Sequence, residues 1–457
     1  MKRCQSVPRF GVRNQIWGSG VNPLKLLSHR AILSIMRKTQ VTIDSLAFKG
    51  YGVARIHGKV VFVPYTAAGD KACVEIVEEK KSYSTGRLIE LLEPSPRRVN
   101  PPCPYFGNCG GCQWQHIDYL AQPELKKEIL QDLLQRLGKL KQTPSIEAFP
   151  SAKPYDYRIR IRLKVAGKAM GYYREGSHQI VDINHCPISH PLVNRILQRL
   201  RGESAVFQLT KEIEISVSPD EGRGMILFHP RSHNRQIEPF AKKLLQSEPI
   251  FQGIAVAGEE KSILFGNPLE FTIPSYQDGN IKLRISPGSF FQVNPEQNQR
   301  LIQTILQLSE PTKKDRVLDL YAGMGNLTLP LAMGTKEILG IEENRTAVDD
   351  AQFNVERNGI QNCHFIQGRV EDVLSHWERG TPHLVVLDPP RAGCKTILDQ
   401  VARLKPQKIV YVSCEPTTFA RDLRLFSEKG YLLEKLRLID MFPQTYHMEV
   451  VGLLQPN

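Results

Sequence analysis

The segment that most constrains the fold is residues 317–326, Val-Leu-Asp-Leu-Tyr-Ala-Gly-Met-Gly-Asn. It reads as an apolar strand, a Gly-x-Gly turn and the start of a helix, the local arrangement by which α/β folds hold a nucleoside cofactor. Strand and helix patterns alternate from about residue 285 onward. The sequence therefore predicts a Rossmann-like α/β domain over residues 285–457.

Polar side chains lie where successive strands of this domain are predicted to end. Asp319 lies in the first strand, Glu342 ends a second, and Asp388 and Cys414 each follow a further apolar strand. Open α/β sheets bind ligands at the carboxyl ends of their strands, so these side chains are expected around one crevice. A thiol there indicates covalent catalysis combined with group transfer. A buried structural role for Cys414 is the alternative, and its place at a strand tip argues against it.

The Gly-x-Gly turn also indicates the kind of cofactor. Glu342 lies 17 residues beyond Gly325, where a carboxylate can accept both ribose hydroxyls of a nucleoside. A dinucleotide site usually shows a third glycine, whereas here Gly325 is followed by Asn-Leu-Thr. The two-glycine form favours S-adenosylmethionine.

Composition restricts the partners and the compartment. Hydrophobic residues make up 41% of the chain, and no apolar run approaches the roughly 18 residues that span a membrane. The net charge of +13 favours a polyanionic partner, most simply nucleic acid. Residues 1–38 are interpreted as a disordered basic arm, or as a start assigned upstream of Met36, in preference to an organellar transit peptide. The odd number of cysteines, nine, argues for a reducing cytosol.

Short β-rich runs separated by turn residues fill residues 39–93. The clearest runs are residues 59–63 and 72–77. Several short strands in so few residues predict a small barrel of OB-like type. Such barrels often bind single-stranded nucleic acid, although a purely structural role is equally compatible with the pattern.

A cysteine cluster follows, with the spacing C-x5-C-x2-C at Cys103, Cys109 and Cys112. These thiols can all reach one metal centre, and Cys186 is the best candidate for a fourth ligand. Four thiolates suit either zinc or an iron–sulfur cluster. Zinc sites more often use two C-x2-C knuckles and only one exists here, so the cluster is favoured. A central α+β domain over residues 94–284 is expected to hold it.

Two elements of this central region have a clear period. Residues 119–140 read as an amphipathic helix whose apolar stripe ends at Leu137. Residues 158–165 alternate between cations and apolar residues, as a strand buried on one face would. Like charges on one stripe repel one another unless an anion neutralises them, so contact with RNA or DNA is favoured over a solvated face. The cations on this stripe are Arg158, Arg160, Arg162 and Lys164.

Six motifs occur in one order along the chain. They are the four cysteines and the residues 290–294 (Phe-Phe-Gln-Val-Asn), 319–326, 388–393 (Asp-Pro-Pro-Arg-Ala-Gly), 413–416 (Ser-Cys-Glu-Pro) and 447–449 (His-Met-Glu). In these motifs the chain resembles the bacterial RNA uracil-5-methyltransferases, specifically the ribosomal RNA branch with a TRAM barrel and an iron–sulfur cluster. The resemblance runs from about Thr39 to the C-terminus.

The resemblance implies a role for each motif. It implies Cys414 as nucleophile and Glu449 as base. Arg369 departs from the pattern, because many relatives place Asp or Asn there; adenine recognition at this position is therefore in question, with Glu371 a candidate substitute. The implied S-adenosylmethionine residues are Gln292, Tyr321, Asn326, Glu342 and Asp388, and the implied [4Fe-4S] ligands are Cys103, Cys109, Cys112 and Cys186.

The chemistry of uracil explains why a nucleophile and a base are needed. C5 of uracil is too weak a nucleophile to attack a methyl sulfonium unaided. Addition of the Cys414 thiolate at C6 gives C5 carbanion character, and Glu449 then removes the C5 proton so that the thiolate can leave. Asp388 and Arg391 are expected to position the base or the sulfonium. A uracil in structured RNA must also be flipped out of its stack.

The expected function is methylation of a uridine at C5 in 23S ribosomal RNA by a cytoplasmic monomer that uses S-adenosylmethionine. The alternatives are a transfer-RNA uridine C5 methyltransferase and a non-catalytic iron–sulfur RNA-binding protein. The barrel and the cysteine cluster, which the transfer-RNA branch usually lacks, favour the ribosomal target. The intact Cys414 and Glu449 argue against the non-catalytic alternative.

Overall fold

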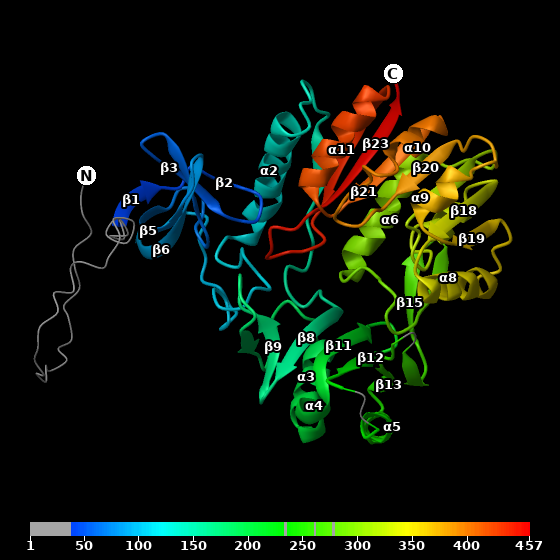
Figure 1. Cartoon of the computed structure of the whole chain (residues 1–457), viewed down its shortest axis with the longest axis horizontal. Helices are drawn as coiled ribbons and strands as arrows, with labels where there is room; N and C mark the ends of the chain where they lie inside the picture. The colour runs from blue at the N-terminus through cyan, green and yellow to red at the C-terminus, as the bar shows by residue number, and fades with distance from the viewer. Residues whose placement is uncertain (1–37, 233–234, 260–261, 277–278) are drawn as a thin grey trace, which may run out of the picture. The chain divides into compact units, whose positions relative to one another are not determined.

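The structure is a computed structural model that describes residues 38–232, 235–259, 262–276 and 279–457 (Figure 1). It divides into two compact units, one with residues up to 100 together with 113–118, and one with residues 101–112 and 119–457. The predicted basic arm lies outside the described residues, except for Lys38. The domain boundaries at residues 93 and 284 stay predictions.

The smaller unit is a six-stranded sheet in the order β1-β5-β6-β4-β3-β2. The strands predicted at residues 59–63 and 72–77 are present as β4 and β5. Their inward side chains pack in an aliphatic core with Val41 and Ile43. Cys73 is buried here. The strands are β1 (Lys38–Thr42), β2 (Ser45–Leu46), β3 (Gly52–Ile56), β4 (Lys59–Val63), β5 (Lys71–Glu79) and β6 (Tyr83–Glu93).

A seven-stranded sheet in the order β10-β9-β8-β11-β12-β13-β14 forms one part of the larger unit. Its strands are β8 (Arg160–Ala166), β9 (Ala169–Tyr173), β10 (Ile180–Asp182), β11 (Thr210–Ser218), β12 (Arg223–Pro230), β13 (Phe251–Val256) and β14 (Ile263–Gly266). The helices α3 (Pro191–Arg201) and α5 (Ile237–Ser247) pack on it, with the short α4 (Ser204–Leu209) between them in sequence. Pro191 starts α3 with a φ already suited to a helix, and the His190 side chain accepts a bond from the Leu192 N–H.

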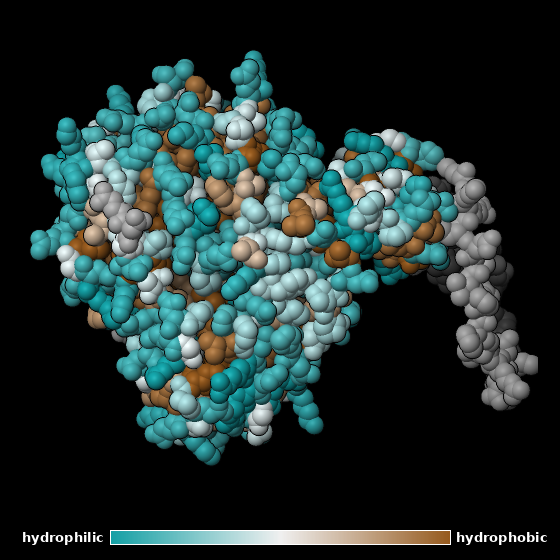
Figure 2. Space-filling view, turned by 180° about the vertical axis from the view of Figure 1, so that it is seen from behind, coloured by the Kyte–Doolittle hydropathy of each residue, from teal (hydrophilic) through white to brown (hydrophobic). Residues whose placement is uncertain are grey.

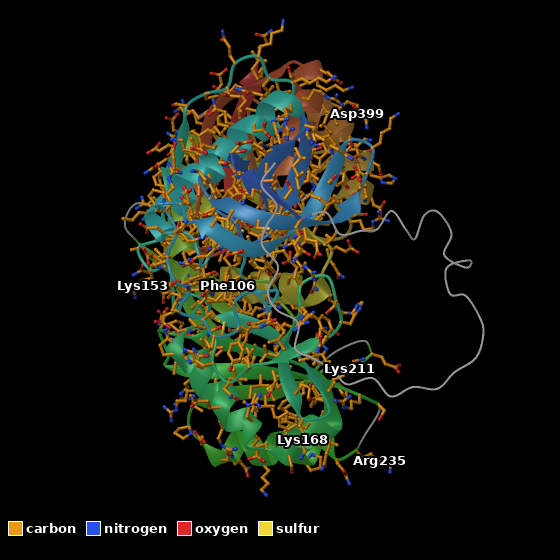
Figure 3. The ribbon with its side chains drawn as sticks, turned by 90° about the vertical axis from the view of Figure 1, so that its left-hand side faces the viewer. Phe106, Lys153, Lys168, Lys211, Arg235 and Asp399 are labelled. Atoms are coloured by element: carbon orange, nitrogen blue, oxygen red, sulfur yellow. The ribbon has the colours of Figure 1, made fainter. Side chains whose placement is uncertain are left out.

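The basic stripe of β8 is partly neutralised by the protein itself. The apolar face is buried as predicted, since Ile161 and Leu163 are at most 1% exposed. On the other face, Glu212 and Glu214 of β11 lie opposite Lys164 and Arg162 and form ion pairs with them. The argument that repulsion here requires an external anion is therefore wrong. Exposed lysines such as Lys168 and Lys211, labelled in Figure 3, remain on this part of the chain.

The other large sheet has eight strands in the order β19-β18-β17-β20-β21-β23-β22-β7. β17 to β21 are parallel, and β23 pairs antiparallel with both β21 and β22. This is the predicted Rossmann-like sheet (Figure 1). Its strands are β7 (Ile146–Phe149), β17 (Arg316–Leu320), β18 (Glu337–Glu342), β19 (Cys363–Gln367), β20 (Leu384–Leu387), β21 (Lys408–Ser413), β22 (Tyr431–Ile439) and β23 (Glu449–Pro456).

Two helices of this part begin after an asparagine whose side chain accepts a backbone N–H of the first turn. The Asn294 side chain accepts the Gln297 N–H at the start of α6, and Pro295 is its first residue. The Asn344 side chain caps α8 in the same way. The helices are α6 (Pro295–Ser309), α7 (Thr328–Ala332), α8 (Arg345–Arg357), α9 (Val370–Ser375), α10 (Leu398–Arg403) and α11 (Pro416–Glu428), and the hairpin β15 (Leu269–Pro274) with β16 (Asn280–Ile285) precedes them.

One strand and one helix of the C-terminal part come from far upstream. β7 pairs in parallel with β22, and α2 (Gln122–Arg136) packs against β7 and α11. α2 is preceded by the single turn η2 (Tyr119–Ala121). The helix ends before Leu137, which is 45% exposed, so the expected apolar stripe stops one turn earlier.

The described helices include none that is both long and apolar enough to cross a membrane. The face shown in Figure 2 is mainly hydrophilic, with hydrophobic residues in small separate patches. Single exposed apolar residues of this kind are normal on a protein surface.

Candidate active site

The predicted site residues meet at the carboxyl edge of the eight-stranded sheet. Glu342 ends β18, Tyr321 directly follows β17, Asp388 follows β20 and Cys414 follows β21. These four strands are parallel neighbours, so their carboxyl ends lie on the same edge. The sheet therefore brings together residues up to 93 positions apart in the sequence.

A cavity lies at this edge. Four of the five predicted cofactor residues line it, namely Gln292, Tyr321, Asn326 and Asp388. The fifth, Glu342, lies beside it, because its Oε2 accepts the N–H of the lining residue Gly323 at 3.0 Å. Its Oε1 accepts the Asn344 N–H at 2.7 Å, which fixes the carboxylate. The other lining residues are Phe290, Phe291, Asp319, Ala322, Met324 and Leu327.

The turn between β17 and α7 has an unusual backbone. Tyr321 has a φ of 67°, in the left-handed region that costs a non-glycine residue free energy. Both its N–H and that of Ala322 point to the Ile341 carbonyl, at 3.0 Å each, which holds the turn against β18. Gly325 has a φ of 94°, and a Cβ there would lie 2.1 Å from Leu329 Cδ1. Only glycine fits this position without backbone strain and a shift of the Leu329 side chain.

Asn298 is a site residue that sequence reasoning missed. It lies on α6, and its side-chain amide exchanges two hydrogen bonds of 2.9 Å with that of Asn326. This pairing fixes the Asn326 side chain at the cavity wall. No local motif marks Asn298, because its partner is 28 residues away and the contact depends on how α6 packs.

Cys414 and Glu449 lie next to each other across two strands. Ser413 pairs with Val450 in the antiparallel β21–β23 ladder, so Cys414 and Glu449 are the next residues in register. Burial, Glu449 and Asp388 together raise the pKa of the Cys414 thiol to about 12, while Arg391 opposes the shift. The thiol is therefore protonated at neutral pH until a cation or a base acts on it.

Two buried carboxyl groups, Asp388 and Glu449, act on the thiol. Burial raises the pKa of Asp388 to about 7. The pKa of Glu449, only 2% exposed, lies well above its ordinary value because of burial and the nearby Asp388. Asp319 also has a pKa raised to about 7 by burial, although the Thr328 hydroxyl donates to it at 2.6 Å. Such a group of acids can share protons and would favour a cationic ligand.

Asp422 on α11 holds the loop that follows Asp388. Its buried carboxylate accepts the Tyr411 hydroxyl and the Cys394 N–H, both at 2.8 Å. Arg421 bonds the same carboxylate and also the Ala392 carbonyl at 2.7 Å. These bonds fix the backbone just after Arg391, at Ala392 and Cys394.

Aromatic rings lie on the segment just before Glu449. The Tyr446 and His447 rings stack with centroids 4.1 Å apart, and Phe442 meets His447 edge-on at 5.8 Å. Burial lowers the pKa of His447 to about 3, helped by Arg391, so the imidazole is neutral. A neutral ring stack of this kind can pack against a flat base.

The four predicted metal ligands converge but do not form a coordination shell. Cys112 and Cys186 pack in one cluster with Tyr157. Burial raises the pKa of Cys109 to about 11, and Cys186 and Cys103 are close enough to add to this shift. Within the described ranges, however, no group of three or more His, Cys, Asp or Glu side chains is placed so that it could hold a metal ion.

Arg369 and its candidate substitute Glu371 lie outside the cavity lining. Arg369 precedes α9 and is exposed, and its Nε lies 3.9 Å from the Glu371 carboxylate. Glu371 in turn accepts the Thr396 hydroxyl at 3.0 Å. Neither side chain is among those that line the cavity.

Comparisons with known proteins agree with this geometry. A family model described as tRNA (Uracil-5-)-methyltransferase matches residues 118–456, and one for the TRAM domain of tRNA (uracil(54)-C(5))-methyltransferase matches residues 39–97. An uncharacterized RNA methyltransferase of Aquifex aeolicus is 35% identical over 91% of this chain and 98% of its own length. The 23S rRNA (uracil(1939)-C(5))-methyltransferase RlmD of Photorhabdus laumondii is 36% identical over 90% of this chain and 95% of its own.

A solved structure shares the fold. The crystal structure of Pyrococcus abyssi tRNA (uracil-54, C5)-methyltransferase in complex with S-adenosyl-L-homocysteine matches with a TM-score of 0.72 and 26% identity. The match covers 91% of this chain and 100% of that one. The chain therefore belongs to the RNA uracil-5-methyltransferase family and carries a TRAM domain at its N-terminal end.

Proposed function

We propose that this enzyme methylates C5 of a uridine in 23S ribosomal RNA with S-adenosylmethionine, through a covalent bond between Cys414 and C6 of the base. The observation that carries the proposal is the register of β21 and β23, which sets a thiol and a buried carboxyl side by side. The cavity lined by Gln292, Tyr321, Asn326 and Asp388 lies at the same edge of the sheet.

Each side chain has a defined task in the proposed reaction. The Cys414 thiolate adds to C6, and the electron pair of the C5–C6 double bond makes C5 nucleophilic. S-adenosylmethionine supplies the electrophilic methyl group that C5 takes. Glu449 then accepts the C5 proton; the C–H electron pair restores the double bond, and the C6–S bond breaks to release the thiolate. The high pKa of Glu449 suits a group that must take a proton from carbon.

Cofactor binding is supported by the shape and charge of the site. Glu342 is held beside the glycine turn, where it could accept ribose hydroxyls. The raised pKa values of Asp388 and Asp319 mean that ionisation of either group is costly. A bound sulfonium would lower that cost, since an opposite charge nearby favours the carboxylate.

The choice of RNA rests on the relatives. The RlmD enzymes of Photorhabdus laumondii and Pectobacterium atrosepticum, named for uracil 1939 of 23S rRNA, are 36% and 35% identical to this chain. The Pyrococcus abyssi enzyme is named for uracil 54 of tRNA and is 26% identical. A transfer-RNA target therefore stays as the second candidate. A monomeric state and a cytoplasmic location are further parts of the proposal.

The test is incubation of the purified enzyme with 5-fluorouridine-substituted 23S ribosomal RNA or tRNA and S-adenosylmethionine. Fluorine at C5 blocks the final proton removal, so a methylated adduct at Cys414 should accumulate and be found by mass spectrometry. An adduct with ribosomal RNA supports the proposal, and an adduct with tRNA alone supports the second candidate. Methyl transfer to ordinary RNA with no adduct would overturn the covalent mechanism.

We also propose a [4Fe-4S] cluster on Cys103, Cys109, Cys112 and Cys186. The chemistry of four cysteines and their mutual approach support it. The thiols of the described structure are not in coordinating positions, so the proposal includes a rearrangement of residues 103–112 on loading. The cluster has no step in the proposed reaction. The test is anaerobic reconstitution with iron and sulfide, followed by iron quantification. The iron content of the wild type is compared with that of the four Cys→Ser variants.

A further inference from the structure

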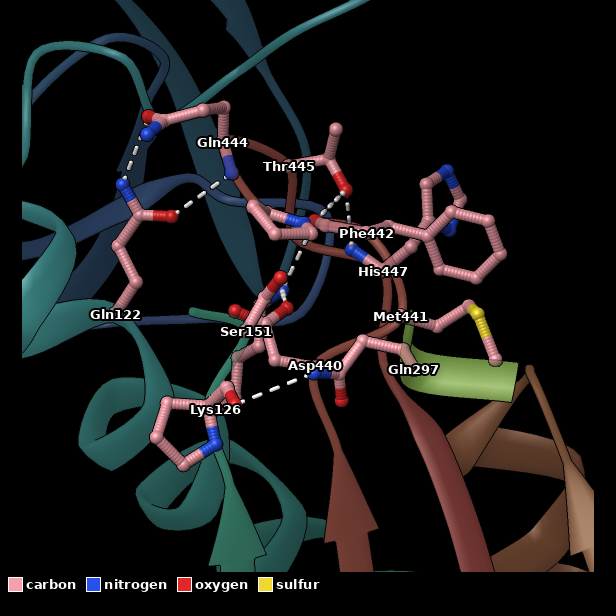
Figure 4. A network of polar contacts seen from close by, with 12 residues as sticks. Gln122, Lys126, Ser151, Gln297, Asp440, Met441, Phe442, Gln444, Thr445 and His447 are labelled. Carbon is pink, nitrogen blue, oxygen red and sulfur yellow. Dashed lines mark hydrogen bonds and ion pairs between the residues drawn. The ribbon is translucent and has the colours of Figure 1, made fainter. Parts of the chain in front are cut away.

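The segment between β22 and β23 positions the proposed base. It runs from Asp440 to Met448, and Glu449 is the first residue of β23. The segment has no regular secondary structure of its own, so its conformation depends on the residues that bind it. Two of these residues lie one helical turn apart on α2, more than 300 positions earlier in the chain (Figure 4).

Lys126 is the first anchor. Its Nζ lies 2.6 Å from Asp440 Oδ1 and donates to the Phe442 carbonyl at 3.2 Å. The side chains of both Lys126 and Asp440 are 0% exposed. Asp440 Oδ2 also accepts the Tyr119 hydroxyl at 2.9 Å, and that hydroxyl accepts the Ser151 N–H at 2.6 Å. The start of the segment is thus held by a buried charge pair with several supporting bonds.

Gln122 is the second anchor. Its side-chain amide donates to Gln444 Oε1 and accepts the Gln444 N–H, both at 3.0 Å. Gln122 and Gln444 are at most 1% exposed. The segment continues with a turn in which the Thr445 hydroxyl donates to the Phe442 carbonyl and accepts the His447 N–H. A chain of short contacts thus leads from α2 to the residues just before Glu449.

Stability alone is a weak explanation for this arrangement. Burial lowers the pKa of Lys126, while Asp440 opposes the shift, so the charge is kept at a cost. Replacement of a buried ion pair by apolar residues of similar volume is often neutral or stabilising. A buried ion pair of this kind is better explained by a role in specifying one conformation of the chain. Here the conformation specified is that of the segment leading into Glu449.

We propose that Lys126 and Gln122 are positioning residues that fix the segment from Asp440 to Met448, so that the Glu449 carboxylate reaches the C5 proton in the elimination step. This inference rests on the proposed function. Proton removal from carbon requires close alignment, and displacement of a catalytic group by about 1 Å can cost about 10²-fold in rate. Addition of Cys414 and methyl transfer do not use Glu449, so they depend less on the anchors.

The test uses this difference between the steps. Lys126→Met, Gln122→Leu and the double variant Lys126→Met with Asp440→Asn are each incubated with S-adenosylmethionine and ordinary ribosomal RNA. The expected result is a methylated covalent adduct at Cys414 that accumulates, with product release slowed on the order of 10²-fold. The double variant removes both members of the buried charge pair, so no unpaired charge is left, and its asparagine still accepts the Tyr119 hydroxyl. It therefore keeps the test valid if Lys126→Met does not fold.

The neighbouring Lys127→Met is the matched control. Lys127 forms an ion pair with Glu124 at 3.1 Å, and its side chain is 31% exposed. The Lys127→Met variant should release methylated RNA at the wild-type rate and accumulate no covalent adduct at Cys414. The inference would be overturned if the folded anchor variants turned over at the wild-type rate. It would also be overturned if adduct formation and turnover fell by the same factor, because that result indicates general damage to the protein. A wild-type enzyme that forms no adduct even with 5-fluorouridine RNA would instead refute the proposed covalent function.

Discussion

Cys414 and Glu449 occupy facing positions at the ends of adjacent antiparallel strands, one residue beyond the Ser413–Val450 pair. The carboxylate is close enough to contribute to the raised pKa of the thiol. One pair of strands thus supplies both the proposed nucleophile and the proposed base, while the parallel strands beside them carry the cavity proposed for the cofactor. The two groups act in different steps, so substitutions can separate them.

Glu449→Gln should stop the reaction after methyl transfer. Glutamine keeps the size of the side chain but cannot accept the C5 proton, so turnover should fall by about 10²-fold or more. The protein–RNA adduct should be retained on a denaturing gel with ordinary uridine RNA. Cys414→Ala is the control, and it should give neither adduct nor product. Normal turnover by Glu449→Gln would show that another group is the base.

Arg391→Gln should make the Cys414 thiol less reactive. The guanidinium lowers the pKa of the thiol, whereas burial, Glu449 and Asp388 raise it. Loss of the positive charge should shift the pH profile of iodoacetamide alkylation upward and slow the reaction at pH 8 roughly threefold to tenfold. Arg369→Gln, an exposed residue outside the cavity lining, is the control and should alkylate like the wild type. Identical profiles for Arg391→Gln and wild type would contradict the role given to Arg391.

Periodicity predicted the local elements well, because it reports which face of an element is buried. The strands that end at Glu342 and Ser413 are confirmed, and so is the buried face of β8. Periodicity could not show what lies opposite an element. The basic stripe of β8 was read as an anion site because Glu212 and Glu214 are about 50 residues away, on a strand whose partner is set by the sheet.

The candidate site was predictable in part from the family resemblance. The resemblance implied Gln292, Tyr321, Asn326 and Asp388, which the structure places around one cavity. Asn298 and Lys126 were missed, since each depends on the packing of a helix against a distant segment. No spacing in the sequence marks a contact across 314 residues.

Asp319 should make the stability of the ligand-free protein depend on pH. Burial raises its pKa to about 7, above the value of about 4 for an unfolded chain. The folded state therefore binds this proton more tightly, and the stabilisation is complete below about pH 4 and lost as the pH rises through about 7. Asp319→Asn should be increasingly stable relative to wild type between pH 5 and pH 8, by at most about 4 kcal/mol. Urea unfolding at several pH values measures this, and parallel curves for the two proteins would contradict it.

Two glycines of the cofactor turn should respond differently to alanine. At Gly325 the new Cβ would lie 2.1 Å from Leu329 Cδ1 at a φ of 94°, so Gly325→Ala should lower stability by about 2 kcal/mol or more. At Gly323 the φ is 56° and no heavy atom lies within 4 Å, so the stability loss should be about 1 kcal/mol. Gly323 lines the cavity, however, and its Cβ would occupy cofactor space. Thermal melts and S-adenosylhomocysteine titrations of both variants test this; equal stability losses would be the contrary result.

Removal of the proposed iron–sulfur cluster should lower the melting temperature of the reconstituted protein. Four thiolate bonds would tie the segment 103–112 to Cys186, and metal binding of this kind adds directly to folding free energy. Anaerobic chelation followed by a thermal melt measures the effect. Cys186→Ser should lose iron and melt like the chelated wild type, whereas Cys363→Ser, in β19 of the other sheet, should keep its iron. An unchanged melting temperature after complete iron loss would show that residues 103–112 are held by protein contacts alone, such as the bonds of the Cys109 and Asn108 N–H groups to the Tyr105 carbonyl.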